Sequence, residues 1–165
     1  MPLVEVNAVM PASVERVWGV MNDVEAYPRI MNHVRSVKVL EHGSNYRRTA
    51  WEMELKGCAL RWTEREEIDA EHHRIEYQSI EGDMAQFEGF WRLDPLSDGT
   101  CRATLSVLFD IGIPLMSDML NPVAERAIRE SSLLMLTSIG AYAASSAEPP
   151  GRVTTYPTGR TDGGA

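Results

Sequence analysis

Apolar and polar residues alternate along most of the first two thirds of this chain, which is the pattern of strands that bury one face. The first such stretch covers residues 3–10, with the sequence Leu-Val-Glu-Val-Asn-Ala-Val-Met. Six more follow, at residues 34–41, 46–55, 59–68, 74–80, 87–95 and 100–109. The links between these six are short and contain turn-forming pairs such as Lys56-Gly57, so neighbouring strands must run antiparallel. The pattern therefore predicts a seven-stranded antiparallel sheet.

A short amphipathic helix is predicted directly after the first strand. Apolar side chains recur at three- and four-residue spacing over residues 14–21, and Ser13 is placed to cap the N-terminus. The helix is expected to end near Asn22. Tyr27 is expected to be non-helical, because a residue that precedes proline disfavours the α conformation. A second helical turn around residues 25–31 is compatible with the sequence.

The last element is a long helix, predicted to begin at Asn121-Pro122, where a capping residue precedes proline at the first helical position. Its apolar face has helical period. This face consists of Leu120, Val123, Ala124, Ala127, Ile128, Leu134, Met135, Ile139 and Tyr142. A long helix with so wide an apolar face has to pack against a large partner, and the sheet is the only one predicted. The fold class is therefore α+β.

Residues 1–146 are interpreted as one domain. A chain of 165 residues is long enough for one substantial core, and 44% hydrophobic with 24% charged residues is typical of a globular protein. Residues 147–165 are rich in Gly, Pro and Thr and have no apolar period, so they are predicted to form a disordered tail.

Composition and motifs argue against several classes of function. The net charge of −8 opposes nucleic-acid binding, which requires clustered Lys and Arg. No apolar run approaches the roughly 18 residues that a membrane helix needs, and no signal peptide is recognisable, so a cytoplasmic protein without a membrane span is expected. Cys58 and Cys101 are expected to be reduced and buried, and the four histidines lack the spacing of metal ligands. Motifs of serine hydrolases, dinucleotide-binding proteins and P-loop enzymes are missing.

Strand alternation also predicts which side chains face the concave side of the sheet. The odd positions of residues 100–109 are apolar and are predicted to face inward. The same test places inward Thr49, Trp51, Met53, Leu55, Ile75, Tyr77, Ser79, Phe87, Gly89, Trp91 and Leu93. The stretch 59–68 is the exception, because its odd positions are all polar. Its even positions, including Trp62, Glu64 and Glu66, are therefore predicted to face inward.

Two carboxylates on an apolar face allow two interpretations. In the functional one, Glu64 or Glu66 acts as a general acid or base, because burial and a like-charged neighbour raise the pKa of a carboxyl group. In the structural one, a bulge brings Glu66 to the rim, or Arg47 or another arginine neutralises the pair. The residues alone leave both open.

Several local motifs accompany this order of elements. They are residues 11–18 (Pro-Ala-Ser-Val-Glu-Arg-Val-Trp), 22–28 (Asn-Asp-Val-Glu-Ala-Tyr-Pro), Trp62, 87–91 (Phe-Glu-Gly-Phe-Trp) and 98–100 (Asp-Gly-Thr). Together they resemble the START-like helix-grip superfamily of polyketide cyclase/dehydrase and lipid-transport proteins, and in particular bacterial aromatic polyketide aromatase/cyclases. The resemblance covers roughly residues 3 to 144. It implies a helix-grip fold, in which a curved seven-stranded sheet wraps around the long C-terminal helix and encloses an apolar cavity.

The resemblance implies two kinds of function, both with a hydrophobic small molecule as ligand and neither with a metal or cofactor. One is an aromatase/cyclase of antibiotic biosynthesis, which binds a poly-β-ketone or aromatic intermediate, promotes ring closure and dehydration, and would have an acyl carrier protein as partner. The other is a non-catalytic protein that binds, carries or sequesters a lipid, a quinone or a finished natural product.

Aromatase/cyclases of this type carry an arginine four residues after the tryptophan that matches Trp62, and here that position is Glu66. Three explanations remain open. Arg47 substitutes from the neighbouring strand, with Tyr46 as another group that would polarise a carbonyl; or the ligand is handled differently; or the reaction does not occur.

The predicted ligand-binding residues are mostly aromatic, and each is alternatively an ordinary core residue. Their shared face would suit a flat or polyene ligand, on which aromatic rings stack. They are Tyr27, Tyr46, Trp51, Met53, Trp62, Tyr77, Phe87, Trp91 and Met135. The apolar loop at residues 111–116 is expected either to cover the edge of the core or to form a methionine-rich lip at the cavity mouth, touching a carrier protein or a membrane surface.

Overall fold

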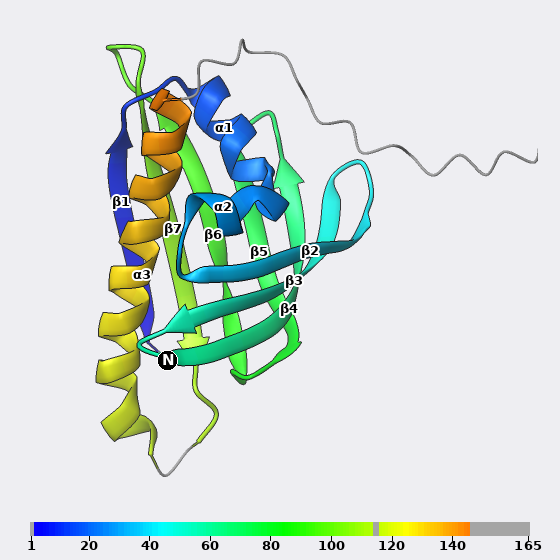
Figure 1. Cartoon of the computed structure of the whole chain (residues 1–165), viewed down its shortest axis with the longest axis vertical. Coiled ribbons are helices and arrows are strands. Elements are labelled where there is room, and N and C mark those ends of the chain that lie inside the picture. Colours follow the sequence, from blue (N-terminus) through cyan, green and yellow to red (C-terminus); the bar gives the residue numbers. More distant parts are fainter. Residues whose placement is uncertain (1, 114–115, 146–165) are drawn as a thin grey trace, which may run out of the picture.

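A strongly curved antiparallel sheet wraps around one long helix (Figure 1). The computed structural model describes residues 2–113 and 116–145. In chain order its elements are β1 (Leu3–Met10), α1 (Val14–Asn22), the 3-10 helix η1 (Val24–Ala26), α2 (Tyr27–Ile30), β2 (Val34–His42), β3 (Tyr46–Leu55), β4 (Cys58–Asp69), β5 (Arg74–Gly82), β6 (Gln86–Pro95), β7 (Cys101–Asp110) and α3 (Ser117–Ser145). The strand order is β1-β7-β6-β5-β4-β3-β2, with every neighbouring pair antiparallel. The predicted helix-grip fold is confirmed.

The long helix α3 packs chiefly against β1, with further contacts to α1 and β7 (Figure 1). Leu136 and Ile139 on this side of the helix are fully buried. The predicted apolar face was too wide, because α3 is covered on one side only. Val123, Leu134 and Tyr142 are exposed.

A two-residue turn sets the register of the hairpin formed by β3 and β4. Lys56 and Gly57 both have positive φ angles, of 50° and 80°, as the tightest hairpin turns require. The pairing that follows places Arg47 opposite Glu66, Thr49 opposite Glu64 and Trp51 opposite Trp62. The turn therefore decides which side chains of β3 meet the two inward glutamates of β4.

The predicted alternation on β4 is confirmed. Trp62, Glu64 and Glu66 are buried on the concave side, whereas Arg61 and Arg65 are exposed. On β7 the prediction holds for the inward set, but Thr104 and Ser106 are also buried on the other face. Both have small side chains and lie in register with bulkier neighbours, Thr104 beside Arg92 and Ser106 beside Phe90.

Two predicted helix boundaries are wrong. The helix α3 begins at Ser117, one turn before Asn121, because the N–H of Leu120 already donates to the carbonyl of Met116 at 2.9 Å. Pro122 therefore lies inside the helix. Tyr27 is helical, with φ −53° and ψ −40°, although it precedes proline. Burial of its ring and a 2.5 Å hydrogen bond from its hydroxyl to the carbonyl of Met21 outweigh the local preference.

Cys101 is buried as predicted, but Cys58 is exposed, because it begins β4 directly after the hairpin turn. The predictions for residues 147–165 and for the middle of the loop at 111–116 lie outside the described residues. No helix in the described ranges combines the length and hydropathy needed to cross a membrane.

Candidate ligand-binding cavity

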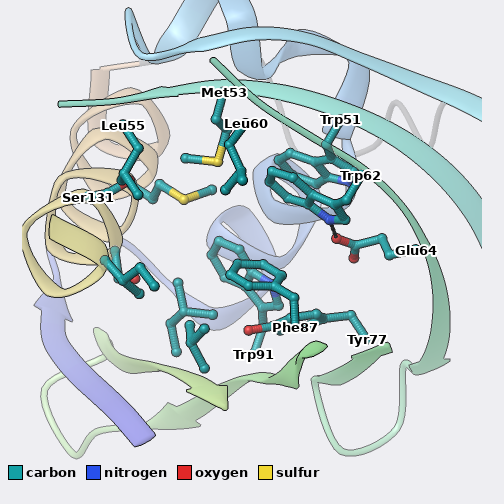
Figure 2. A pocket seen from close by; sticks show the side chains of 15 residues that line it. Trp51, Met53, Leu55, Leu60, Trp62, Glu64, Tyr77, Phe87, Trp91 and Ser131 are labelled. Carbon is teal, nitrogen blue, oxygen red and sulfur yellow. Dashed lines mark hydrogen bonds between the residues drawn. The ribbon is translucent and has the colours of Figure 1, made fainter. Parts of the chain in front are cut away.

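A cavity lies between the concave face of the sheet and α3 (Figure 2). Counted out to its opening, it holds about 500 Å³ of space free of atoms, little of which is wide enough for a water molecule. It is lined by Trp51, Met53, Leu55, Leu60, Trp62, Glu64, Tyr77, Phe87, Trp91, Leu105, Val107, Ile128, Ser131, Ser132 and Met135. The inner space is narrow. A ligand therefore has to be thin, or has to move α3 and the sheet apart.

Aromatic rings make up one side of the cavity. The indoles of Trp51 and Trp62 are stacked, with centroids 5.5 Å apart and planes 8° from parallel, and the ring of Phe87 lies 5.0 Å from that of Trp62. Both indole N–H groups are satisfied, one by Thr49 at 2.8 Å and the other by Glu64 at 2.6 Å. The rings therefore present faces and edges to the cavity rather than unpaired donors, which suits a flat apolar ligand.

Glu64 is the one ionisable carboxyl on the cavity wall among the described residues. It is 3% exposed, and its Oε1 accepts the hydrogen bond from the Trp62 indole. Within the described part of the chain, its Oε2 has no hydrogen-bond partner. Burial and the nearby charge of Glu66 raise the pKa of Glu64 well above its ordinary value, against smaller opposing effects of Trp62 and Arg47. The raised pKa favours the neutral form of this carboxyl group, which presents an O–H donor.

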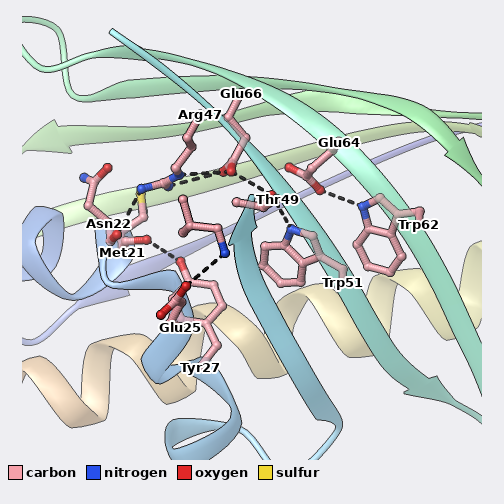
Figure 3. Close-up of polar contacts among 11 residues, drawn as sticks. Met21, Asn22, Glu25, Tyr27, Arg47, Thr49, Trp51, Trp62, Glu64 and Glu66 are labelled. Carbon is pink, nitrogen blue, oxygen red and sulfur yellow. Dashed lines mark hydrogen bonds and ion pairs between the residues drawn. The ribbon is translucent and has the colours of Figure 1, made fainter. Parts of the chain in front are cut away.

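Glu66 lies two residues further along β4 in a different environment, a buried polar cluster with Arg47, Thr49 and the carbonyl of Asn22 (Figure 3). Arg47 Nε and Nη2 donate to the two oxygens of Glu66 at 3.0 and 3.2 Å, and Arg47 Nη1 donates to the carbonyl of Asn22 at 3.0 Å. The Thr49 hydroxyl adds a bond of 2.9 Å to Glu66. Burial by itself lowers the pKa of Arg47, but Glu66 outweighs it and the pKa is raised. We call these four residues the arginine cluster.

The two predicted catalytic glutamates lie in different environments, Glu66 in the arginine cluster and Glu64 on the cavity wall. Neither Arg47 nor Glu66 belongs to the cavity wall, and their polar atoms bond to each other. The structural interpretation offered two arrangements for Glu66, a position at the rim or neutralisation by Arg47. The observed geometry matches neutralisation by Arg47. Both oxygens of Glu66 already accept hydrogen bonds from Arg47, and one also accepts from Thr49, so Glu66 is engaged within the arginine cluster and not with the cavity.

Two other predicted site residues lie away from the cavity wall. Tyr27 is buried behind it, with its ring 5.6 Å from that of Trp51 and edge-on to it. Burial raises the pKa of its hydroxyl, which is already committed to Met21. Tyr46 lies on the outer face, because it occupies an even position of β3. Its hydroxyl bonds Glu41 at 2.8 Å, and Arg65 covers its ring at 4.4 Å, so it cannot polarise a carbonyl in the cavity.

The remaining predicted ligand-binding residues do line the cavity. They are Trp51, Met53, Trp62, Tyr77, Phe87, Trp91 and Met135. The Tyr77 hydroxyl donates to the carbonyl of Ser106 at 2.7 Å, and Gly89 makes room for this bond, since a Cβ there would collide with the same carbonyl oxygen. Tyr77 therefore contributes its ring to the wall and keeps its hydroxyl for the sheet.

Sequence reasoning missed the serines on the helical side of the cavity, Ser131 and Ser132. They follow Ile128 by three and four residues and precede Met135 by four and three. Helical period alone would have found them, had polar residues on the apolar face been considered. The described residues contain no group of three or more side chains placed to hold a metal ion.

Comparison with known proteins identifies the fold family. A family model described as "Polyketide cyclase / dehydrase and lipid transport" matches residues 10–132, about three quarters of the chain. The chain belongs to this family. Curated proteins similar to this chain include the "Ribosome association toxin RatA" of Escherichia coli K12, 24% identical over 67% of this chain and 69% of that protein, and RatA of Pseudomonas aeruginosa PAO1, 25% identical over 73% and 83%.

Several solved structures share this fold. TTHA0849 from Thermus thermophilus is 29% identical, with a TM-score of 0.81 over 88% of this chain and all of that one. The Zhui aromatase/cyclase from Streptomyces sp. R1128 is 22% identical, with a TM-score of 0.79 over 86% and 93%. A START superfamily protein from Mycobacterium smegmatis reaches a TM-score of 0.74 at 15% identity over 86% of this chain and 96% of its own. At such identities the latter two likenesses establish the fold.

Proposed function

We propose that this protein binds a flat, apolar small molecule carrying a carbonyl oxygen, and that neutral Glu64 donates a hydrogen bond to that oxygen. The observation that supports this most is the state of Glu64 on an otherwise aromatic and aliphatic wall: buried, pKa raised, and one oxygen without a partner in the described chain. A hydrogen bond in such surroundings is stronger than one in water, because little solvent competes for it. The donor would therefore set the orientation of the ligand, and the rings would supply its contact area.

A cofactor-free ring closure and dehydration of a poly-β-ketone is the finer proposal. Glu64 would give its proton to a carbonyl oxygen while an enol carbon of the same molecule bonds to the carbonyl carbon. The Glu64 carboxylate would then take the proton that the enol hydroxyl releases, which restores the acid. Loss of water would use the same group twice, first to protonate the departing hydroxyl and then to remove a proton from the neighbouring carbon. The raised pKa of Glu64 and the shared fold of an aromatase/cyclase favour this over binding alone.

Ribosome association, which appears in the names of the curated relatives, has less support in this chain. The net charge is −8, and arginines on the outer face of the sheet pair with carboxylates, Arg65 with Glu67 at 3.0 Å and Arg74 with Glu76 at 3.1 Å. Such pairing leaves little positive charge for RNA phosphates at this face.

Matched ligands test the binding proposal. Fluorenone is a flat ketone, and fluorene has the same rings without the carbonyl. Three of the four tryptophans line the cavity, so quenching of intrinsic fluorescence reports occupancy. We expect fluorenone to bind about five- to tenfold more tightly than fluorene, as one hydrogen bond in a dry site provides. Glu64→Leu should abolish the difference, whereas Glu64→Gln, which keeps a donor, should preserve it. Equal affinities in the wild type would overturn the proposal.

Turnover separates the enzyme from the binding protein. The Glu64→Gln variant should bind like the wild type but fail to cyclise the poly-β-ketone made by a minimal polyketide synthase, because an amide cannot transfer the proton. Glu67→Gln, on the outward face of the same strand, serves as control and should cyclise normally. Products are followed by liquid chromatography with mass spectrometry. If the wild type binds flat ketones and yields no cyclised product, the carrier or sequestering function replaces catalysis.

A further inference from the structure

An unpaired polar atom lies on the opposite side of the cavity from Glu64. Figure 2 shows Ser131 on α3 facing the cavity from the far side, near Leu55. Its Oγ is buried and has no hydrogen-bond partner in the described chain.

Unpaired polar atoms at such positions are uncommon, because a buried donor or acceptor without a partner costs free energy. A helical serine or threonine ordinarily satisfies its hydroxyl on the carbonyl one turn earlier. Thr137 on the same helix does so, donating to the carbonyl of Leu133 at 3.0 Å. Ser131 does not, although it belongs to the same element and has the same chemistry.

We propose that Ser131 is a second polar anchor of the cavity, so that the preferred ligand is a flat apolar molecule with an oxygen at each of two opposite ends. This inference rests on the proposed binding function and narrows its ligand class. A fatty acid or a simple lipid has one polar end and would leave one anchor unpaired. Quinones, dihydroxyarenes and polyketones have oxygen at both ends and would satisfy both.

The chemistry of the two ends is compatible with such a ligand. The serine hydroxyl is uncharged and both donates and accepts hydrogen bonds. Neutral groups at both ends match an uncharged ligand, whose transfer into the cavity carries no cost of burying a charge.

Two ligands that differ by one hydroxyl test the inference. We would measure the affinities of 2-naphthol and naphthalene-2,6-diol by tryptophan quenching, with naphthalene as the reference without oxygen. The wild type should bind the diol about fivefold more tightly than 2-naphthol, the effect of one added hydrogen bond. Ser131→Ala should remove this preference and leave 2-naphthol binding unchanged. Ser138→Ala, on the same helix but away from the cavity wall, is the matched control and should keep it.

The outcomes separate this inference from the function on which it rests. Equal affinities for the two naphthols in the wild type, or a preference that survives Ser131→Ala, would overturn the second anchor. The binding function would then stand if 2-naphthol still binds more tightly than naphthalene and loses that advantage in Glu64→Leu. If neither naphthol binds, the binding function fails and the inference fails with it. Alanine favours helix, so Ser131→Ala is expected to fold.

Discussion

Glu64 and Glu66 are two residues apart on the same strand and the same face of the sheet, and both are at least 97% buried, yet their surroundings give them opposite chemistry. Glu66 forms a bidentate ion pair with Arg47 and accepts a hydrogen bond from Thr49. Glu64 has only the indole of Trp62. Burial alone therefore does not determine the chemistry of a carboxyl group, because the donors and charges that reach it also act on it.

The register of the β3–β4 hairpin explains why the donors are unequal. Arg47 lies directly opposite Glu66, whereas the residue opposite Glu64 is Thr49, whose hydroxyl turns to Glu66 instead. Glu64 is left with a single uncharged donor, the Trp62 indole, beside the cavity. The same hairpin thus builds an ion pair on one side and, on the other, an acid whose raised pKa favours its neutral form.

The largest expected effect comes from breaking the arginine cluster. Arg47→Met keeps the apolar stem of the side chain but leaves Glu66 buried without its counter-ion. We expect the free energy of unfolding to fall by about 3–5 kcal/mol, as measured by urea denaturation. Arg65→Met, which removes an exposed arginine from β4, should change it by less than about 1 kcal/mol. If the free energy of unfolding of Arg47→Met fell as little as that of Arg65→Met, the fold would tolerate Glu66 buried without its counter-ion.

Removing both charges should reverse much of this loss. In the double variant Arg47→Met/Glu66→Leu no buried charge remains unpaired, so we expect at least about 2 kcal/mol of the stability lost in Arg47→Met to return. The double and both single variants are compared by urea denaturation under one set of conditions. A double variant no more stable than Arg47→Met would mean that packing, rather than charge, makes the cluster stabilising.

Much of the difference between Glu64 and Glu66 could be predicted from the sequence. Alternation on β4 placed Glu64 and Glu66 inward, since four polar residues on the other positions left no choice of face. The Lys56-Gly57 turn was also visible, and a two-residue hairpin there makes Arg47 the partner of Glu66. Alternation alone could not show which glutamate meets the cavity, because that depends on how the curled sheet meets α3. For the same reason the position of Tyr27 behind the wall was not predicted, whereas Ser131 was missed because only apolar residues were considered on the buried face of α3.

The pH dependence of stability should show the neutral state of Glu64. Its pKa is raised in the folded protein, so above the ordinary value of 4.5 the folded state keeps a proton that the unfolded state has lost. Stability should then decrease as pH rises above 4.5, by at most about 1.4 kcal/mol per pH unit for one proton. Glu64→Gln mimics the protonated acid and lacks this dependence. Urea denaturation of both proteins between about pH 5 and 8 should therefore show the variant gaining stability relative to the wild type with rising pH, and parallel curves would contradict a raised pKa.

The smallest effect on stability is expected from a solvent-exposed ion pair. Lys56 in the hairpin turn contacts Glu130 on α3 at 2.6 Å, and both side chains are more than half exposed. This pair joins β3 to α3 as the arginine cluster joins β3 to β4, but solvent offsets most of its attraction. Lys56→Met should lower the free energy of unfolding by no more than about 1 kcal/mol. The difference should vanish in about 1 M salt, which screens exposed charges.

Lys38→Met is the control, because Lys38 forms no ion pair in the described chain. A loss above about 2 kcal/mol at low salt would show that the contact between hairpin and helix, rather than the buried cluster alone, stabilises the curled sheet.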